Sequence, residues 1–151
     1  MKKTVIFDLD GTLALIDVRK NMSLKKNGRI DWKVFHKPEH IVFDKPNEPV
    51  IQCANMYYDW GYNVVILSGR PDTTEKETRK WLQDYMVPWH KLIMRPHKTR
   101  GFTSDEVLKE ELLKKHLDIN DIFCIFDDRQ KVVDMWRSLG LTCFQVAPGD
   151  F

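Results

Sequence analysis

The feature that most constrains this chain is an apolar run that leads into two aspartates. The run Val5–Leu9 is apolar apart from Asp8, as in a parallel strand buried on both faces, and Asp10 follows it directly. Residues i and i+2 of a strand point to the same face, so the two carboxylates lie close together. Like charges at such a distance are costly unless a cation or a proton lies between them. The sequence therefore predicts a buried strand that ends at a charged site.

Strand and helix patterns alternate along the rest of the chain, without repeats or linkers. This alternation predicts an α/β sandwich with a mainly parallel sheet, and the length of 151 residues suits one domain, residues 1–151. Residues 14–48 are polar and irregular, and we expect them to form an insertion with one helix around 32–35. The expected strands are 5–9, 64–67, 92–94, 122–126 and 142–146, and the expected helices begin near 50, 73, 103 (with a Thr-x-x-Glu capping box) and 132.

Three of these strands end in residues with oxygen-bearing side chains. They are Asp8 with Asp10, Ser68, and Asp127 with Asp128. A single aspartate after a strand is usually a turn former or a helix cap, but four carboxylates and a hydroxyl at one edge of a sheet are hard to explain as turns. Ligands of such sheets bind beyond the carboxyl ends of the strands. Oxygen ligands at this density suit Mg²⁺, so we predict a magnesium site at this edge.

The charge of the chain is unevenly spread. The net charge is +2, but residues 19–37 carry seven basic side chains against Asp31 alone, which makes that segment +6 and the remainder −4. A basic insertion on a mildly acidic body favours a polyanionic partner. The alternative for charge alone is a solvated loop.

Several classes of protein are disfavoured. No apolar run approaches the ~20 residues of a membrane span, and Asp8 and Asp10 interrupt the only stretch that resembles a signal peptide. The three cysteines, Cys53, Cys124 and Cys143, form no Cys-x-x-Cys pair, so we expect apolar packing in a reducing cytoplasm. The five histidines show no metal-binding spacing, and only His97 is expected near a site loop. Four of the five tryptophans are expected in the core or at its edge: Trp60, Trp81, Trp89 and Trp136.

The stretch Asp8-Leu9-Asp10-Gly11-Thr12 resembles the signature of the haloacid dehalogenase superfamily, and it stands in the right context, directly after an apolar strand. The resemblance implies that superfamily's Rossmannoid three-layer sandwich with a small cap, here residues 14–48. It implies a phosphoaspartyl mechanism, with Asp8 as nucleophile and Asp10 as acid and base. Mg²⁺ would be held by Asp8, the backbone carbonyl of Asp10, Asp127 and Asp128. The residues implied at the substrate phosphate are Thr12, Ser68, Gly69 and a helical lysine, Lys109.

A closer resemblance is to the phosphatase half of the polynucleotide kinase/3′-phosphatase family. It rests on Met94-Arg95-Pro96-His97, Thr99-Arg100, residues 104–111 and the ending from Phe126 to Phe151, and it is weakest across residues 20–48. The P-loop of the family's kinase half does not occur, so we expect no 5′-kinase activity in this chain. The functional positions that this resemblance carries over are Asp8, Asp10, Arg19, Arg70, Asp105, Lys109, Asp127 and Asp128.

Some of these positions have a plainer interpretation. Arg19 would contact substrate phosphate or sugar, or be a solvated arginine of the insertion. Arg70 would bind substrate, cap a helix or pair with a carboxylate. Asp105 and Lys109 are i and i+4 on one helix, where an exposed ion pair is the alternative, and Lys98 is a rival for the phosphate-binding lysine. Residues Trp32, Phe35 and His36 would stack a terminal base or form the core of the cap.

Three functions are compatible with this sequence. The first is a Mg²⁺-dependent phosphomonoesterase that removes 3′-phosphates from DNA or RNA ends in end repair, with a separate kinase or ligase as a possible partner. The second is a nucleotidase or small-metabolite phosphatase with the same chemistry. The third is a non-enzymatic module on the same fold, which the intact motif positions disfavour. The basic insertion favours the first function, because a small metabolite with one phosphate needs little positive charge on the enzyme, whereas a polynucleotide carries many phosphates.

Overall fold

The computed structural model describes residues 3–98 and 103–151, and Thr99 and Arg100 of the resemblance lie outside them. A five-stranded sheet has the order β5-β4-β1-β6-β7, and all neighbouring pairs are parallel. The expected α/β fold with a mainly parallel sheet is therefore confirmed. The strands of this sheet are β1 (Thr4–Phe7), β4 (Asn63–Pro71), β5 (Lys91–Arg95), β6 (Ile122–Asp127) and β7 (Cys143–Gln145).

Strand β1 lies at the centre, where the chain changes direction across the sheet. The chain passes from β1 through β4 to β5 on one side and then returns to β6 and β7 on the other. Such a switch point opens a crevice at the carboxyl ends of the central strands. Phe7 is in register with Phe126, and the Asp8 backbone N–H donates to the Phe126 carbonyl at 2.9 Å. The sheet therefore brings Asp8 and Asp127 side by side.

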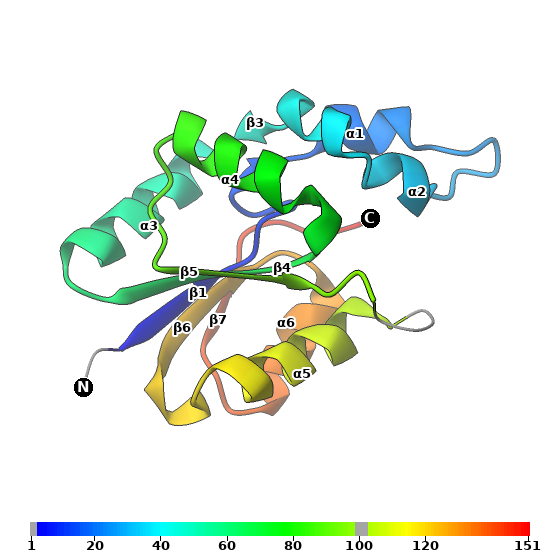
Figure 1. Cartoon of the computed structure of the whole chain (residues 1–151). Helices are drawn as coiled ribbons and strands as arrows, with labels where there is room; N and C mark the ends of the chain where they lie inside the picture. Colours follow the sequence, from blue (N-terminus) through cyan, green and yellow to red (C-terminus); the bar gives the residue numbers. More distant parts are fainter. Residues whose placement is uncertain (1–2, 99–102) are drawn as a thin grey trace.

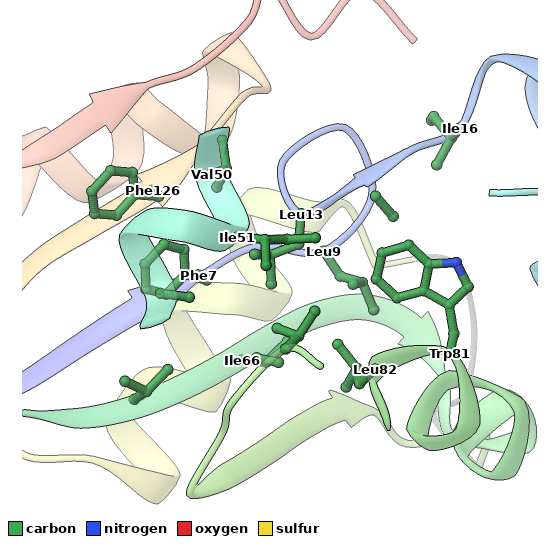
Figure 2. Packing of buried hydrophobic residues seen from close by; sticks show 14 of the residues in the cluster. Phe7, Leu9, Leu13, Ile16, Val50, Ile51, Ile66, Trp81, Leu82 and Phe126 are labelled. Atoms are coloured by element: carbon green, nitrogen blue, oxygen red, sulfur yellow. The ribbon is translucent and has the colours of Figure 1, made fainter. Parts of the chain in front are cut away.

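Helices cover both faces of the sheet (Figure 1). On one face, α3 (Glu48–Asp59) and α4 (Glu75–Asp84) pack on the outward side chains of β1, including Phe7 (Figure 2). On the other, α5 (Asp105–His116) and α6 (Gln130–Ser138) pack on Ile6 and its neighbours. Two short 3₁₀ turns complete the connections, η2 (Asp72–Thr74) and η3 (Ile119–Asp121).

The insertion lies at the carboxyl edge of the sheet, on the side of α3 and α4 (Figure 1). Its two ends pair as an antiparallel ribbon of β2 (Ala14–Leu15) and β3 (Lys45–Pro46). Between them are α1 (Asp17–Met22), the expected helix α2 (Trp32–Phe35) and the 3₁₀ helix η1 (Pro38–Phe43). Its buried residues Ile16, Phe35 and Ile41 join the core of the α3–α4 face. The insertion is therefore packed onto the body of the protein.

Some local expectations are wrong. The strand expected over 64–67 continues through Ser68 to Pro71 as β4. Helix α5 has Ser104 as its N-cap with no side-chain capping bond, so the capping box from Thr103 does not form, and the Thr103 carbonyl accepts from Arg95 instead. Trp60 is 67% exposed at the end of α3, whereas Trp81 and Trp136 are buried as expected. Among the described residues, no helix combines the length and apolar character that a membrane crossing requires.

Candidate active site

Three carboxylates meet where β1 and β6 end. Ligand oxygens of Asp8, Asp127 and Asp128 all lie within 4.8 Å of one another, and all three residues are buried. Lys109 of α5 reaches them from the face of the sheet that α5 and α6 cover. Its ammonium donates to Asp8 at 2.7 Å and to Asp127 at 3.0 Å. Lys109, not the exposed Lys98, is therefore the lysine in contact with the expected nucleophile. Within the part of the chain that the structure describes, one buried cation faces three carboxylates, which leaves this cluster short of positive charge.

The electrostatics of the cluster follow from that imbalance. Burial, reinforced by the negative charge of Asp127, raises the pKa of Asp8 well above its usual value. Burial and Asp127 also raise the pKa of Asp128 to about 6. Burial would lower the pKa of Lys109, but the carboxylates of Asp127 and Asp8 outweigh it and raise that pKa. A divalent cation among these oxygens would relieve the repulsion, and three carboxylates with room for further oxygen ligands suit Mg²⁺.

The turn after β1 explains why glycine and threonine follow the two aspartates. Gly11 has φ +85°, and a Cβ atom there would lie 2.1 Å from Oδ2 of Asp128. A larger residue would be strained and would push Asp128 out of the cluster. Thr12 stays a predicted contact of the substrate phosphate, and its hydroxyl lies 3.0 Å from Oδ2 of Asp8 and 3.4 Å from Oδ1 of Asp128. In this structure Thr12 orients the carboxylates.

Asp10, the expected acid and base, lies apart from this cluster and is held by two arginines. Oδ1 of Asp10 accepts from Nε and Nη2 of Arg70, at 2.9 and 2.6 Å, and from Nη2 of Arg19. Both guanidinium groups are fully buried, so Arg19 is not the solvated arginine of the plainer interpretation, and Arg70 pairs with carboxylates, which was one of its alternatives. Burial would raise the pKa of Asp10, but the two guanidinium charges outweigh it and lower that pKa below its usual range.

A second carboxylate completes this network, and the sequence analysis missed it. Asp44, which follows η1, accepts from Arg19 at 3.0 and 2.7 Å and from Arg70 at 2.8 Å. Its side chain is fully buried. The two carboxylates and two guanidinium groups balance in charge and tie the insertion to β4. No motif marks Asp44, because it approaches Arg70 only when η1 folds over the sheet.

Of the remaining expected residues, Gly69 and Asp105 line the cavity of the site, whereas Ser68 does not. Asp105 does not pair with Lys109 on an exposed face, as the plainer interpretation had it, but accepts from Arg95 and Arg129, at 2.9 and 2.8 Å. Gly69 leaves space for this carboxylate, since a Cβ atom there would lie 2.5 Å from Oδ1 of Asp105. Ser68 is buried, and its hydroxyl accepts from the backbone N–H of Arg70 at 3.1 Å.

A cavity of about 410 Å³ opens over the carboxylates. Of the histidines, His36 lines it, whereas His97, the one expected near the site, forms an exposed pair with Asp72 at 2.6 Å. Burial lowers the pKa of His36 to about 4, so its ring is neutral at pH 7. The residues around the cavity are Asp8, Asp10, Trp32, Phe35, His36, Gly69, Pro71, Arg95, Ser104, Asp105, Glu106, Arg129, Lys131 and Phe151.

The comparison with protein families decides which group of phosphatases this site belongs to. The family model of the polynucleotide kinase PNKP phosphatase domain matches residues 2–151, almost the whole chain. The chain belongs to this family. The resemblance to haloacid dehalogenase phosphatases, and to this branch of them, is thereby confirmed, and the chain is a phosphatase domain.

Individual relatives agree with this assignment. A protein of the Autographa californica nuclear polyhedrosis virus, provisionally named a bifunctional polynucleotide kinase/RNA ligase, is 30% identical over 95% of this chain and 19% of its own length. A chain in the structure of a Pnkp1/Rnl/Hen1 complex is 35% identical, with a TM-score of 0.79 over 100% of this chain and 48% of its own. A phosphatase structure from Clostridium acetobutylicum, 12% identical, shares the fold alone, with a TM-score of 0.74 over 96% of this chain and 84% of its own. The chain thus spans half or less of the first two relatives.

Proposed function

We propose that this PNKP-type phosphatase domain removes 3′-phosphates from polynucleotide ends, with Mg²⁺ and through a phosphoaspartyl intermediate. The observation that carries the proposal is the separation of two carboxylates on one turn. Asp8 lies among Lys109, Asp127 and Asp128, whereas Asp10 lies two residues on in a different network of arginines. One aspartate is placed for attack on phosphorus, and the other for proton transfer.

In the first step, an oxygen of Asp8 forms a bond to phosphorus while the bond from phosphorus to the 3′-oxygen breaks. Asp10, ionised in its arginine network, takes up a proton when the phosphate monoester binds and then gives that proton to the leaving oxygen. In the second step, Asp10 takes a proton from water, which attacks the phosphoaspartate and releases inorganic phosphate. The ammonium of Lys109, 2.7 Å from Asp8, lies where it neutralises charge that spreads over the phosphoryl oxygens.

The arginine network orients the Asp10 carboxylate, although the same two charges favour its ionised form. Both guanidinium groups donate to Oδ1 of Asp10, and among the described residues no hydrogen bond to Oδ2 is present. Arg19 and Arg70 therefore act on the substrate through Asp10 in our proposal, by fixing which oxygen exchanges the proton. This departs from the direct substrate contact expected for Arg19.

The metal site is proposed on the same residues. Asp8, Asp127 and Asp128 would hold Mg²⁺ through their side chains, and Asp10 through its backbone carbonyl. When bound, the ion would supply positive charge to the phosphoryl group and allow Asp8 to ionise despite its burial. The side chain of Asp10 is turned toward the arginines and away from this site.

The substrate end is proposed from the insertion, which we regard as a cap over the site. Arg19 is buried in the Asp10 network, so it adds nothing to the surface charge that the sequence suggested. The exposed cations Lys25, Lys26 and Arg29 remain on the turn between α1 and α2. They would attract the phosphates of a polymer, which a single metabolite lacks. The cavity of about 410 Å³ has the size of a small-molecule site, so a nucleotidase stays the alternative.

The partners are proposed from the relatives. The viral relative is named for kinase and ligase activities, and the structural relative was solved in a complex with Rnl and Hen1. We infer that this phosphatase works beside a kinase or a ligase in nucleic-acid end repair. The free thiols of Cys53, Cys124 and Cys143 agree with the reducing cytoplasm that we propose as the compartment.

The proposal is tested by phosphate release from a short oligonucleotide with a 3′-phosphate and from thymidine 3′-phosphate, with Mg²⁺ or with EDTA. We expect release only with Mg²⁺, and a higher kcat/KM on the oligonucleotide that falls as salt rises. The Asp8→Asn protein is the blank. Equal or better turnover of the mononucleotide would favour the nucleotidase, and release in EDTA would refute the role of the metal.

A further inference from the structure

An aromatic wall lies on the side of the active-site cavity formed by the insertion. Trp32 and His36 of the α2 segment line the cavity, and Phe151 lines it from the end of the sequence. The chain reaches this place because its last residues pass beside α2 (Figure 1). Asp8 and Asp10 line the same cavity, so the wall and the two carboxylates share one enclosed space.

The members of this wall differ in how deeply they are buried. Phe35 is fully buried, and the guanidinium carbon of Arg19 lies 4.2 Å from its ring centre, so Phe35 belongs to the core of the cap. Trp32 is 38% exposed, and its ring stacks on His36 with centroids 5.8 Å apart and planes 22° apart. An exposed tryptophan that lines a cavity leaves an aromatic face available for a flat ligand.

His36, which lines the cavity, also has a polar atom that lacks a partner in the described part of the chain. Nδ1 of His36 is buried and has no hydrogen-bond partner among the described residues. Buried polar atoms are nearly always satisfied, so an orphan in a residue that lines a cavity calls for a partner such as a water, an ion or a ligand. The neutral ring has one donor and one acceptor nitrogen, and a ligand hydroxyl or base edge reaches the covered Nδ1 only when the ring rotates.

Two cations, Arg129 and Lys131, also line the cavity. Arg129 donates to Asp105, and its guanidinium carbon lies 5.1 Å from the ring centre of Phe151 and 6.0 Å from that of Trp32. Lys131, also on the lining, is exposed and forms no ion pair within the described part of the chain. Aromatic faces beside cations, next to a phosphoryl-transfer site, match a nucleotide: a base, a sugar and a charged phosphate.

We propose that Trp32, His36 and Phe151 form a subsite for the base of the terminal nucleotide whose 3′-phosphate is removed. The inference rests on the proposed function and adds the group that the enzyme recognises beside the phosphate. Trp32 stacks on the base, and Lys131 contacts the next phosphate of the strand. Stacking accepts any base, so this subsite selects nucleotide ends over other phosphomonoesters without reading sequence.

The test measures binding in the Asp8→Asn protein, which holds the ligand without turnover. The two ligands are thymidine 3′-phosphate and the same sugar phosphate with hydrogen in place of the base. Calorimetry with Mg²⁺ gives both dissociation constants, and we expect the base to tighten binding about 5- to 100-fold. Adding Trp32→Ala lowers this ratio about 5-fold or more, and Trp32→Phe restores most of it.

The matched control is Trp60→Ala, which removes another exposed tryptophan, at the end of α3. It keeps the wild-type ratio. The proposal of a base subsite would be refuted if the ratio of the two dissociation constants were equally small in all these proteins, or if Trp60→Ala lowered it as much as Trp32→Ala. Turnover by the protein with Asp8 intact is measured separately. If Trp32 controls the binding ratio but neither ligand releases phosphate, the subsite stands and the proposed phosphatase reaction on 3′-phosphates fails.

Discussion

Replacement of Lys109 by methionine removes the one cation that, in residues 3–98 and 103–151, pairs with the carboxylate cluster. The ammonium is 2% exposed and donates to Asp8 and Asp127, at 2.7 and 3.0 Å. Each charge-assisted hydrogen bond is worth about 1.5–3 kcal/mol, and removing one partner of a buried ion pair costs about 3–5 kcal/mol. Because methionine fills much of the same volume, we expect Lys109→Met to lower the free energy of unfolding by about 3–5 kcal/mol.

Thermal unfolding in EDTA measures this loss. For a chain of this size, 1 kcal/mol shifts the Tm by about 2–4 °C, so the expected fall is about 6–20 °C. The pKa of Lys109 is raised in the folded state, so its contribution is complete below the unfolded pKa of about 10.4 and is constant across neutral pH. Mg²⁺ should raise the Tm of the variant more than that of the wild type, because its carboxylates lack a competing cation.

The matched control is Lys114→Met, on the same helix. Lys114 forms an exposed ion pair with Glu110 at 3.3 Å, and such pairs contribute about 0–1 kcal/mol. We expect a change in Tm of at most a few degrees. Equal effects of the two substitutions, or an Lys109→Met protein as stable as the wild type in EDTA, would refute the reasoning from burial.

Three further predictions concern the same site. In EDTA, the Tm should rise as pH falls from about 7 toward 5, because the pKa of Asp128 is raised to about 6 in the folded state and its protonation there stabilises the folded protein. Mg²⁺ should reverse this trend, and a Tm that falls in EDTA would contradict the prediction. Gly69→Ala should lower kcat/KM about tenfold or more, because its Cβ displaces Asp105, and unchanged kinetics would exclude that clash. Arg70→Lys should slow hydrolysis of a 3′-phosphate more than that of p-nitrophenyl phosphate, whose leaving group needs no proton from Asp10; equal losses would mean that Arg70 does not act through Asp10.

The cap shows where sequence reasoning reached its limit. Its helix at Trp32–Phe35 was predicted, but the burial of Arg19 was not. Arg19 lies in a basic, polar segment, and the composition of that segment is typical of a solvated loop. The difference lies in Asp44, which is 25 residues away and meets Arg19 only after η1 packs against α4. Charge counted along the sequence therefore overstated the charge on the surface.

The positions of two histidines, His36 and His97, also depend on tertiary packing. His97 follows the end of β5 and was expected near the site, yet it pairs with Asp72 on the surface. His36 carries no motif and lines the cavity. Which of two loops turns toward the carboxylates depends on long-range packing, and neither periodicity nor spacing contains that information.

The sequence by itself determined the sheet and the carboxylates at its edge. Apolar runs that end in Asp8, Ser68 and Asp127 can be read locally, and parallel strands bring their carboxyl ends to one edge whatever the detailed packing. Only the tertiary structure decided how the two aspartates of the first turn are divided. Asp8 faces Lys109, which comes from α5, whereas Asp10 faces two arginines, one from the insertion (Arg19) and one from β4 (Arg70). These ion-pair partners are 9 to 101 residues apart, and the local sequence around each aspartate does not predict which of them it meets.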